Sequence, residues 1–100
     1  MQNIMKTFED LKFIDRREPY STIDSQALMF FDNGYGISVI TGEGAYSDEQ
    51  HPYEAAVLKG NQFEWNICYD TPITDDVIGH NTAKDITSIM KRIQELPIAK

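Results

Sequence analysis

The stretch ALMFFDNGYGISVIT, residues 27–41, places an Asn-Gly pair between two runs rich in β-forming side chains. A type I′ turn requires φ > 0 at both central residues, and Asn-Gly adopts this conformation more readily than most pairs. We therefore expect a β-hairpin with Asn33 and Gly34 as its two-residue loop. This register sets Phe30 opposite Ile37, and both faces of the hairpin carry apolar side chains.

A second hairpin is predicted from Tyr53 to Tyr69, with Gly60-Asn61 as its two-residue loop. The strand after the loop, FEWNIC at residues 63–68, alternates between apolar and polar side chains and favours a half-buried strand. We therefore expect Phe63 and Trp65 to lie in the core.

An amphipathic helix is predicted from Ala83 to Leu96. Its apolar residues recur at helical spacing; they are Ile86, Ile89, Met90, Ile93 and Leu96. Thr82 and Asp85 have the spacing of a capping box, and Pro97 follows as a helix stop.

The remaining segments complete one small domain. Residues 7–11 are expected to make one or two helical turns, residues 12–15 to begin an edge strand, and residues 16–25 to form a loop. A chain of 100 residues has room for one domain, which we assign to residues 1–100. The predicted fold is α+β: an antiparallel meander of about four strands with the C-terminal helix packed on one face.

Composition excludes several function classes. Sixteen Asp and Glu residues against nine Lys and Arg residues give a net charge of −7, whereas direct binding to nucleic acid or to anionic membranes requires clustered cations. No apolar run approaches the roughly 20 residues of a membrane span, and the N-terminus lacks the apolar stretch of a secretory signal. A single cysteine cannot form an internal disulfide. We expect an acidic, intracellular domain.

The net charge lies in the middle of the chain, because residues 43–85 carry nine acidic and two basic residues. These acids fall mainly in two predicted loops, residues 42–53 and 70–80. The candidate binding residues are Tyr46, Asp48 and Glu49 in the first loop and Asp70, Asp75, Asp76 and His80 in the second. Tyrosine is enriched at protein interfaces, so Tyr46 within the acidic loop is the aromatic residue we expect at an interface. Two solvated loops without a binding role are the alternative.

Metal and cofactor motifs are not found. Residues 70–76 lack the spacing of a calcium-binding EF-hand loop. Cys68, His51 and His80 lack the short spacings typical of zinc sites. No metal or cofactor is therefore predicted.

A nucleophilic site is a further alternative, with Cys68 as nucleophile, His80 or His51 as base and Asp70 as the orienting carboxylate. Cys68 falls in a predicted strand, where a single cysteine usually behaves as a small apolar residue. We therefore expect a protein that is not an enzyme.

Three stretches resemble a group of small proteins encoded by bacteriophages and prophages, for which we know no established activity. They are MKTFEDL at residues 5–11, FDNGYGISV at residues 31–39 and CYDTPITDDVI at residues 68–78. The resemblance covers most of the chain and aligns Met5 with the usual start of the group, so residues 1–4 are an extension or an alternative start. It implies a phage setting in the cytoplasm of a bacterial host cell and assigns no catalytic residues.

These observations favour a non-enzymatic accessory protein that binds and modulates a host or phage protein through an acidic loop surface. A small-ligand domain, with a nucleotide or metabolite held between helix and sheet, is the main alternative. A DNA mimic is less favoured, because −7 over 100 residues is a low charge density for imitating DNA. A homodimer through the two-sided apolar hairpin is a further expectation.

Overall fold

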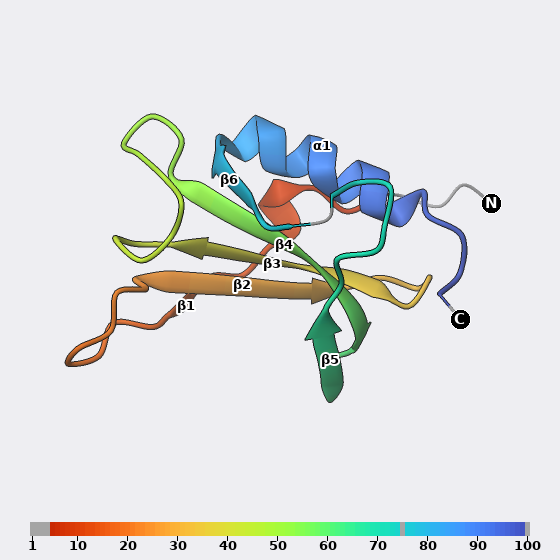
Figure 1. Ribbon diagram of the computed structural model, residues 1–100, viewed down its shortest axis with the longest axis horizontal. Helices are drawn as coiled ribbons and strands as arrows, with labels where there is room; N and C mark the ends of the chain where they lie inside the picture. Colours follow the sequence, from red (N-terminus) through yellow and green to blue (C-terminus); the bar gives the residue numbers. More distant parts are fainter. Residues whose placement is uncertain (1–4, 75, 100) are drawn as a thin grey trace.

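An antiparallel sheet with one helix across one face makes up the fold (Figure 1). The computed structural model describes residues 5–74 and 76–99, so the expected extension at residues 1–4 lies outside the described residues. The elements follow in the order η1 (Phe8–Asp10), β1 (Ile14–Asp15), β2 (Ser25–Phe30), β3 (Tyr35–Thr41), β4 (Tyr53–Asn61), β5 (Glu64–Ile67), β6 (Ile78–Asn81) and α1 (Ala83–Gln94). The predicted α+β meander with a C-terminal helix is confirmed, with six strands in the described residues in place of about four.

The first five strands form the meander, and β6 departs from it. Strand order is β1-β2-β3-β4-β5, with every pair antiparallel. β5 pairs with the C-terminal half of β4, whereas β6 pairs with the N-terminal half through Tyr53 and Ala55. Because β3 occupies the other edge of β4, β5 and β6 follow one another along the same edge.

Helix α1 covers the sheet with the predicted apolar stripe. Its buried residues are Ile86, Ile89, Met90 and Ile93, and they form one core with Ala27, Ile37, Val39, Ala55 and Val57 of the sheet. The predicted capping box is also present. Thr82 Oγ1 accepts a hydrogen bond of 3.1 Å from the Asp85 backbone N–H, and the Thr82 N–H donates to Asp85 Oδ2 at 2.9 Å. These bonds satisfy donors that a helix start leaves unpaired.

The β2–β3 hairpin has a three-residue loop, so the predicted two-residue loop is wrong. Phe30 pairs with Gly36, where the predicted register placed Ile37. The loop spans residues 32–34, and Gly34 has φ +84°, as in a type I turn followed by a left-handed residue. A one-residue change of register exchanges the faces of a strand, so Ile37 lies under the helix.

The β4–β5 hairpin turns two residues later than predicted. Asn61 pairs with Glu64, and its Oδ1 accepts hydrogen bonds from the Phe63 and Glu64 N–H groups at 2.9 and 3.1 Å. Phe63 therefore lies at the turn and is 88% exposed, while Trp65 is 36% exposed. The prediction that both belong to the core is wrong.

The face of the sheet opposite α1 carries its own apolar side chains. Cross-strand pairing places on this helix-free face Gln26, Leu28, Phe30, Ser38, Ile40, Glu54, Ala56, Leu58, Trp65 and Ile67. The Phe30 and Trp65 rings lie 6.4 Å apart, centroid to centroid. Figure 1 shows α1, β6 and η1 on one side of the sheet and β5 turning away from them. Of the residues forming this face, Glu54 alone carries a charge.

Candidate functional site

Two long loops and strand β6 meet at one end of the sheet (Figure 1, left). Residues 16–24 connect β1 to β2, and residues 42–52 connect β3 to β4. The Gly44 N–H donates a hydrogen bond of 2.9 Å to the Thr22 carbonyl, which joins the two loops. The long β3–β4 loop is therefore hydrogen-bonded to the β1–β2 loop.

Tyr46 is held by its backbone and exposed at its ring. Its N–H donates to Glu54 Oε1 at 3.0 Å, and its carbonyl accepts a hydrogen bond of 2.7 Å from the His80 N–H. Gly79 permits this approach, because a Cβ at that position would lie 2.7 Å from the Tyr46 Cβ. Tyr46 is nevertheless 66% exposed, so the fold presents an aromatic side chain from a fixed backbone.

Asp48 closes a turn with His51 in the same loop. Asp48 Oδ1 accepts hydrogen bonds from the Gln50 and His51 N–H groups at 2.9 and 2.8 Å, and it lies 3.0 Å from His51 Nδ1. Desolvation raises the pKa of Asp48, but the hydrogen bonds from His51 and Gln50 outweigh it and hold the pKa below its ordinary value. Asp48 is therefore a fixed anion at neutral pH.

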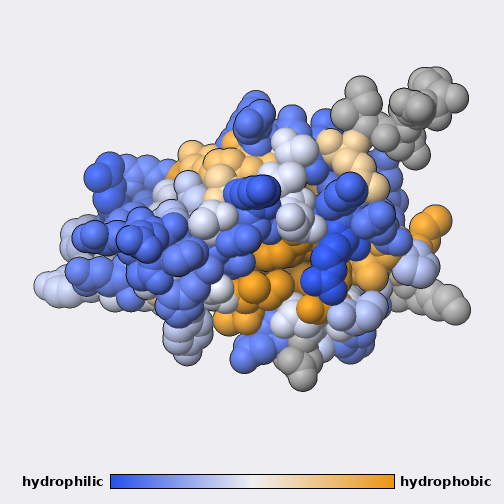
Figure 2. All heavy atoms as spheres, turned by 90° about the horizontal axis from the view of Figure 1, so that it is seen from above, coloured by the Kyte–Doolittle hydropathy of each residue, from blue (hydrophilic) through white to orange (hydrophobic). Residues whose placement is uncertain are grey.

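The loop and its neighbours form a surface of one charge sign. We define the acidic loop surface as Glu43, Tyr46, Asp48, Glu49, His51, Glu54 and His80. Residues 42–58 contain no Lys or Arg, and Figure 2 shows hydrophilic side chains over this end of the molecule. Arg17, on the neighbouring β1–β2 loop, forms a 2.8 Å ion pair with Asp15. The surface is suited to attracting cations.

The structure brings only part of the second predicted group to this surface. His80 reaches it, with φ +59° and an exposed side chain. Asp70 lies beside Lys59. Lys59 is six residues along β4 from Tyr53, where that strand begins next to the acidic loop. At the rise of an extended strand, this separates Lys59 from Tyr53 by about 20 Å. Asp76 precedes β6 and accepts a hydrogen bond from the next backbone N–H at 2.7 Å. Asp75 lies outside the described residues.

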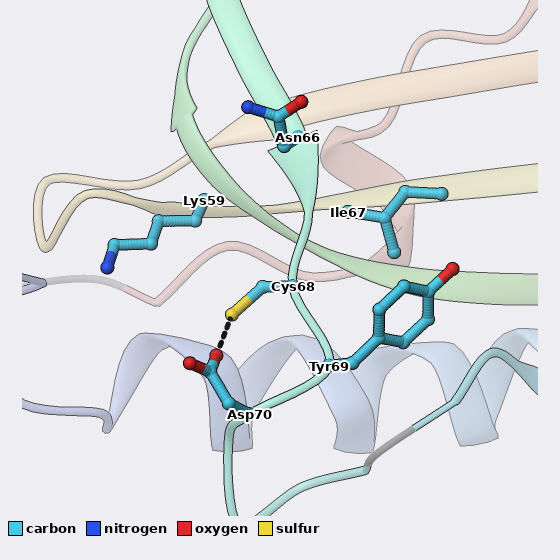
Figure 3. A pocket seen from close by; sticks show the side chains of 6 residues that line it. All are labelled: Lys59, Asn66, Ile67, Cys68, Tyr69 and Asp70. Carbon is cyan, nitrogen blue, oxygen red and sulfur yellow. Dashed lines mark hydrogen bonds between the residues drawn. The ribbon is translucent and has the colours of Figure 1, made fainter.

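Cys68 and Asp70 lie in a separate hollow of about 530 Å³ (Figure 3). The Cys68 thiol donates a hydrogen bond of 2.8 Å to Asp70 Oδ1. Burial, and then the Asp70 carboxylate, raises the pKa of Cys68, while the same hydrogen bond lowers the pKa of Asp70. Because the thiolate is the nucleophile, this environment works against nucleophilic chemistry. Of the two predicted bases, His80 is joined to Tyr46 through its backbone, and the His51 ring lies against Asp48.

Residues 5–74 and 76–99 contain no group of three or more His, Cys, Asp or Glu side chains placed to hold a metal ion. The zinc alternative combined Cys68 with His51 and His80, and the structure pairs Cys68 with Asp70 and His51 with Asp48. Over the same residues, no helix has the length and apolar character needed to cross a bilayer.

The residues predicted from the sequence omit three members of the site, which are Glu43, His51 and Glu54. Glu54 orients Tyr46 through its side chain, Glu43 is an exposed acid of the same loop, and the sequence presents His51 only as a metal ligand or a base. The available signals were an acidic residue at the start of a strand that follows the loop, and the Asp48-x-x-His51 spacing. Asp readily closes such turns by accepting hydrogen bonds from the following backbone.

Comparison with known proteins gives no relative: no family model, no curated protein and no solved structure matches the chain. The resemblance to phage-encoded proteins therefore stays a prediction.

Proposed function

We propose that this chain is a non-enzymatic binding protein that docks through its acidic loop surface on a basic face of a protein partner. The setting that we propose is the cytoplasm of a phage-infected or prophage-carrying bacterium, with a host or phage protein as the partner that is modulated. The setting rests on the sequence resemblance alone, whereas the mode of binding rests on the contacts of residues 42–54.

The fixed backbone of Tyr46 is the observation that carries the proposal. Ordering a loop during binding costs conformational free energy, and a loop already held in place avoids much of this cost. Hydrogen bonds at both the N–H and the carbonyl hold Tyr46, while the residue stays 66% exposed. Exposed, oriented tyrosines are among the side chains that most often dominate interface energetics.

The charge of the surface identifies the chemistry of the partner. Glu43, Asp48 and Glu49 are exposed, and residues 42–58 have no basic side chain to neutralise them. Opposite charges across an interface accelerate association and select the partner, and salt screens both effects. A Lys- or Arg-rich protein surface with a cavity for one tyrosine is the partner that fits.

Affinity capture with matched variants tests this proposal. The tagged full-length chain is incubated with nuclease-treated bacterial lysate beside the variants Tyr46→Ser and Glu49→Lys, at increasing salt concentration. We expect one dominant basic protein whose capture fades with salt, and an affinity for the purified partner about tenfold or more lower in either variant.

The controls remove the same side-chain chemistry at other places. Tyr20→Ser deletes a fully exposed tyrosine of the β1–β2 loop that belongs neither to the acidic loop surface nor to β5, and Glu95→Lys makes the same charge change at the end of α1. Both should bind like the wild type. Equal losses in test and control variants, or capture that is independent of salt, would contradict docking through this surface.

Small-ligand binding remains the second candidate, on the evidence of a hollow of about 570 Å³ between α1 and residues 73–74 and 77–79. Apolar Ile73 and Ile89 line it together with the charged Arg92. It lies outside the helix–sheet core, where the expected pocket is filled by side chains. Ligand sites usually enclose most of their ligand, and this hollow is shallow, so the candidate ranks second.

A thermal-shift screen separates the two functions. A nucleotide or metabolite that binds the hollow should raise the melting temperature of the wild type, and Arg92→Ala should remove that rise. Tyr46→Ser should leave it unchanged. If no compound of the screen raises the melting temperature, the ligand candidate loses its support.

A further inference from the structure

Strand β5 is an edge strand that carries an apolar stripe. In the part of the chain that the structure describes, β5 pairs only with β4. Trp65, Ile67 and Tyr69 alternate with polar or buried side chains and are 36%, 42% and 49% exposed. Figure 3 shows Ile67 and Tyr69 on one side of the chain, with Cys68 and Asp70 on the other. Phe63, 88% exposed, precedes the strand at the turn.

The outer edge of β5 presents free backbone groups. The Cys68 N–H donates to the Val57 carbonyl at 2.7 Å, so Cys68 faces β4. Backbone direction alternates along an antiparallel strand, so the N–H and C=O groups of Trp65 and Ile67 point away from β4. An edge of this kind is a template for pairing with another strand.

The exposed apolar area is large for one short strand. A fully exposed aromatic side chain offers about 150–250 Å², so Phe63, Trp65 and Tyr69 at their observed exposures offer about 300–400 Å² together. Stable interfaces bury about 800 Å² per partner. The β5 stripe thus supplies about half of such an interface, and Phe30 of the helix-free face adjoins it, since its ring lies 6.4 Å from that of Trp65.

The distribution of charge indicates what covers this area. Two copies of a chain with net charge −7 repel each other through most of their surface. The β5 stripe and the adjoining helix-free face carry no charge near Trp65, since Glu54 lies at the far end of β4 and Glu64 points to the other side of β5. This is the region where two copies meet without juxtaposing like charges.

We propose that the chain forms a homodimer in which β5 of one copy pairs antiparallel with β5 of the second and joins the two apolar stripes. A two-fold axis at Trp65 sets it opposite the partner's Trp65 and sets Phe63 opposite the partner's Ile67. Antiparallel partners share a face, so all the apolar side chains stay together. Glu64 then faces the partner's Asn66, which avoids a contact between like charges.

This dimer differs from the one expected through the β2–β3 hairpin, because β2 and β3 lie inside the sheet. β2 is paired with β1 on one edge and with β3 on the other, and β3 is paired with β2 on one edge and with β4 on the other. Joining two β5 edges extends the sheet across the axis and leaves both acidic loop surfaces free. Two such surfaces on one particle also permit bivalent binding.

Analytical ultracentrifugation of the full-length chain over a concentration series tests the proposal. We expect a reversible monomer–dimer equilibrium of the 11.5 kDa chain, with a Kd of about 1–100 μM. Rising salt should strengthen the dimer, because it screens the repulsion between acidic copies. Binding of a basic partner at the acidic loop surface responds to salt in the opposite direction, so the two proposals fail separately.

Two variants and one control locate the interface. Ile67→Pro removes an outward N–H without removing a bond to β4, and Phe63→Lys places a charge on the stripe. Each should raise the Kd at least tenfold. Tyr20→Lys makes a matched aromatic-to-lysine change at a fully exposed position on the β1–β2 loop and should leave the Kd unchanged.

Trp65 supplies an independent readout, because the chain has one tryptophan. Its fluorescence emission should shift to shorter wavelength as the dimer forms, and this shift should be absent in Phe63→Lys at the same concentration. Circular dichroism identifies a variant that fails to fold, and Phe63→Lys, at an exposed turn position, is the variant that decides if Ile67→Pro does not fold. A wild type that stays monomeric up to about 0.5 mM, or a dimer insensitive to Phe63→Lys, would overturn the proposal.

Discussion

The carbonyl of Tyr46 accepts a hydrogen bond of 2.7 Å from the N–H of His80, and this contact joins the acidic β3–β4 loop to strand β6. The residues are 34 positions apart in the sequence, and the bond adds to the pairing of β4 with β6 that also joins the two segments. His80 makes the bond with φ +59°, a conformation that is unfavourable for a non-glycine residue. The contact is thus maintained at some conformational cost.

Gly79→Ala should break this contact. A Cβ at residue 79 would lie 2.7 Å from the Tyr46 Cβ and 2.9 Å from its carbonyl oxygen, so Tyr46 has to move. We expect the free energy of unfolding to fall by about 1–3 kcal/mol, and partner affinity to fall with it. Chemical denaturation measures the first effect and titration of the captured partner the second.

His80→Gly is the companion variant, because it keeps the N–H while relieving the positive φ. It should leave stability equal or raise it slightly, since glycine adopts positive φ without steric cost. If Gly79→Ala is as stable as the wild type, the approach of Tyr46 to β6 has no structural importance.

Ile86→Ala and Phe63→Ala should differ sharply in stability. Ile86 is fully buried between α1 and the sheet, whereas Phe63 is 88% exposed at a turn. Truncating a buried isoleucine costs about 2–5 kcal/mol, whereas an exposed substitution stays within about 0.5 kcal/mol. Urea denaturation of both variants checks this difference, and a large loss in Phe63→Ala would restore the core position that the sequence pattern favoured.

The helix was predictable because its determinants are local. The apolar spacing of residues 86–96 and the Thr82–Asp85 capping box lie within one segment and act over one or two turns. The structure confirms the element and its buried stripe, with the helix ending at Gln94 in place of Leu96. Local propensity and tertiary packing agree here, and this agreement is the condition under which sequence patterns are reliable.

The first hairpin register was not predictable because a distant element determines it. Asn33 Nδ2 donates to the carbonyls of Ile93 and Leu96 at the end of α1, at 2.8 and 3.1 Å. The Ala99 N–H in turn donates to the Asn33 carbonyl at 2.8 Å. Asn33 therefore caps the helix and leaves the positive-φ position to Gly34. No pattern within residues 27–41 contains this information.

The candidate site was predictable only where sequence proximity coincides with proximity in space. Tyr46, Asp48 and Glu49 lie in one loop and stay together, but Asp70 and His80 separate because β6 runs back along β4. The pairing of Ile78 with Ala55 produces this arrangement. An irregular four-residue strand gives no alternation long enough to be read from sequence.

Acid should weaken the capping of α1. Hydrogen bonds from the Thr82 backbone and then from its side chain hold the pKa of Asp85 below 3.8. As the pH falls, Asp85 therefore becomes protonated at a higher pH in the unfolded chain than in the folded one. The stability that the Asp85 carboxylate contributes is complete above about pH 4 and is lost as the pH falls through the folded pKa. Unfolding monitored by circular dichroism from neutral to acid pH should show the loss.

Two variants separate charge from hydrogen bonding at this cap. Asp85→Asn keeps an acceptor oxygen but cannot titrate, so its stability should vary less between about pH 4 and pH 2. Thr82→Ala removes the acceptor for the Asp85 N–H and should cost about 1 kcal/mol at neutral pH as well. An acid dependence of Asp85→Asn identical to that of the wild type would show that other carboxyl groups dominate.

The Cys68 thiol should become more reactive when Asp70 loses its charge. Burial is the main cause that raises the pKa of Cys68, and the hydrogen-bonded Asp70 carboxylate adds to it. In Asp70→Asn the second cause disappears, so the pKa falls and a larger fraction of thiolate is present at a given alkaline pH. Labelling by a chromogenic disulfide should therefore be faster than in the wild type, with its pH profile displaced toward lower pH.

Asp76→Asn, an equal charge change outside this hollow, should label like the wild type. Equal profiles for all three proteins would mean that burial alone protects the thiol.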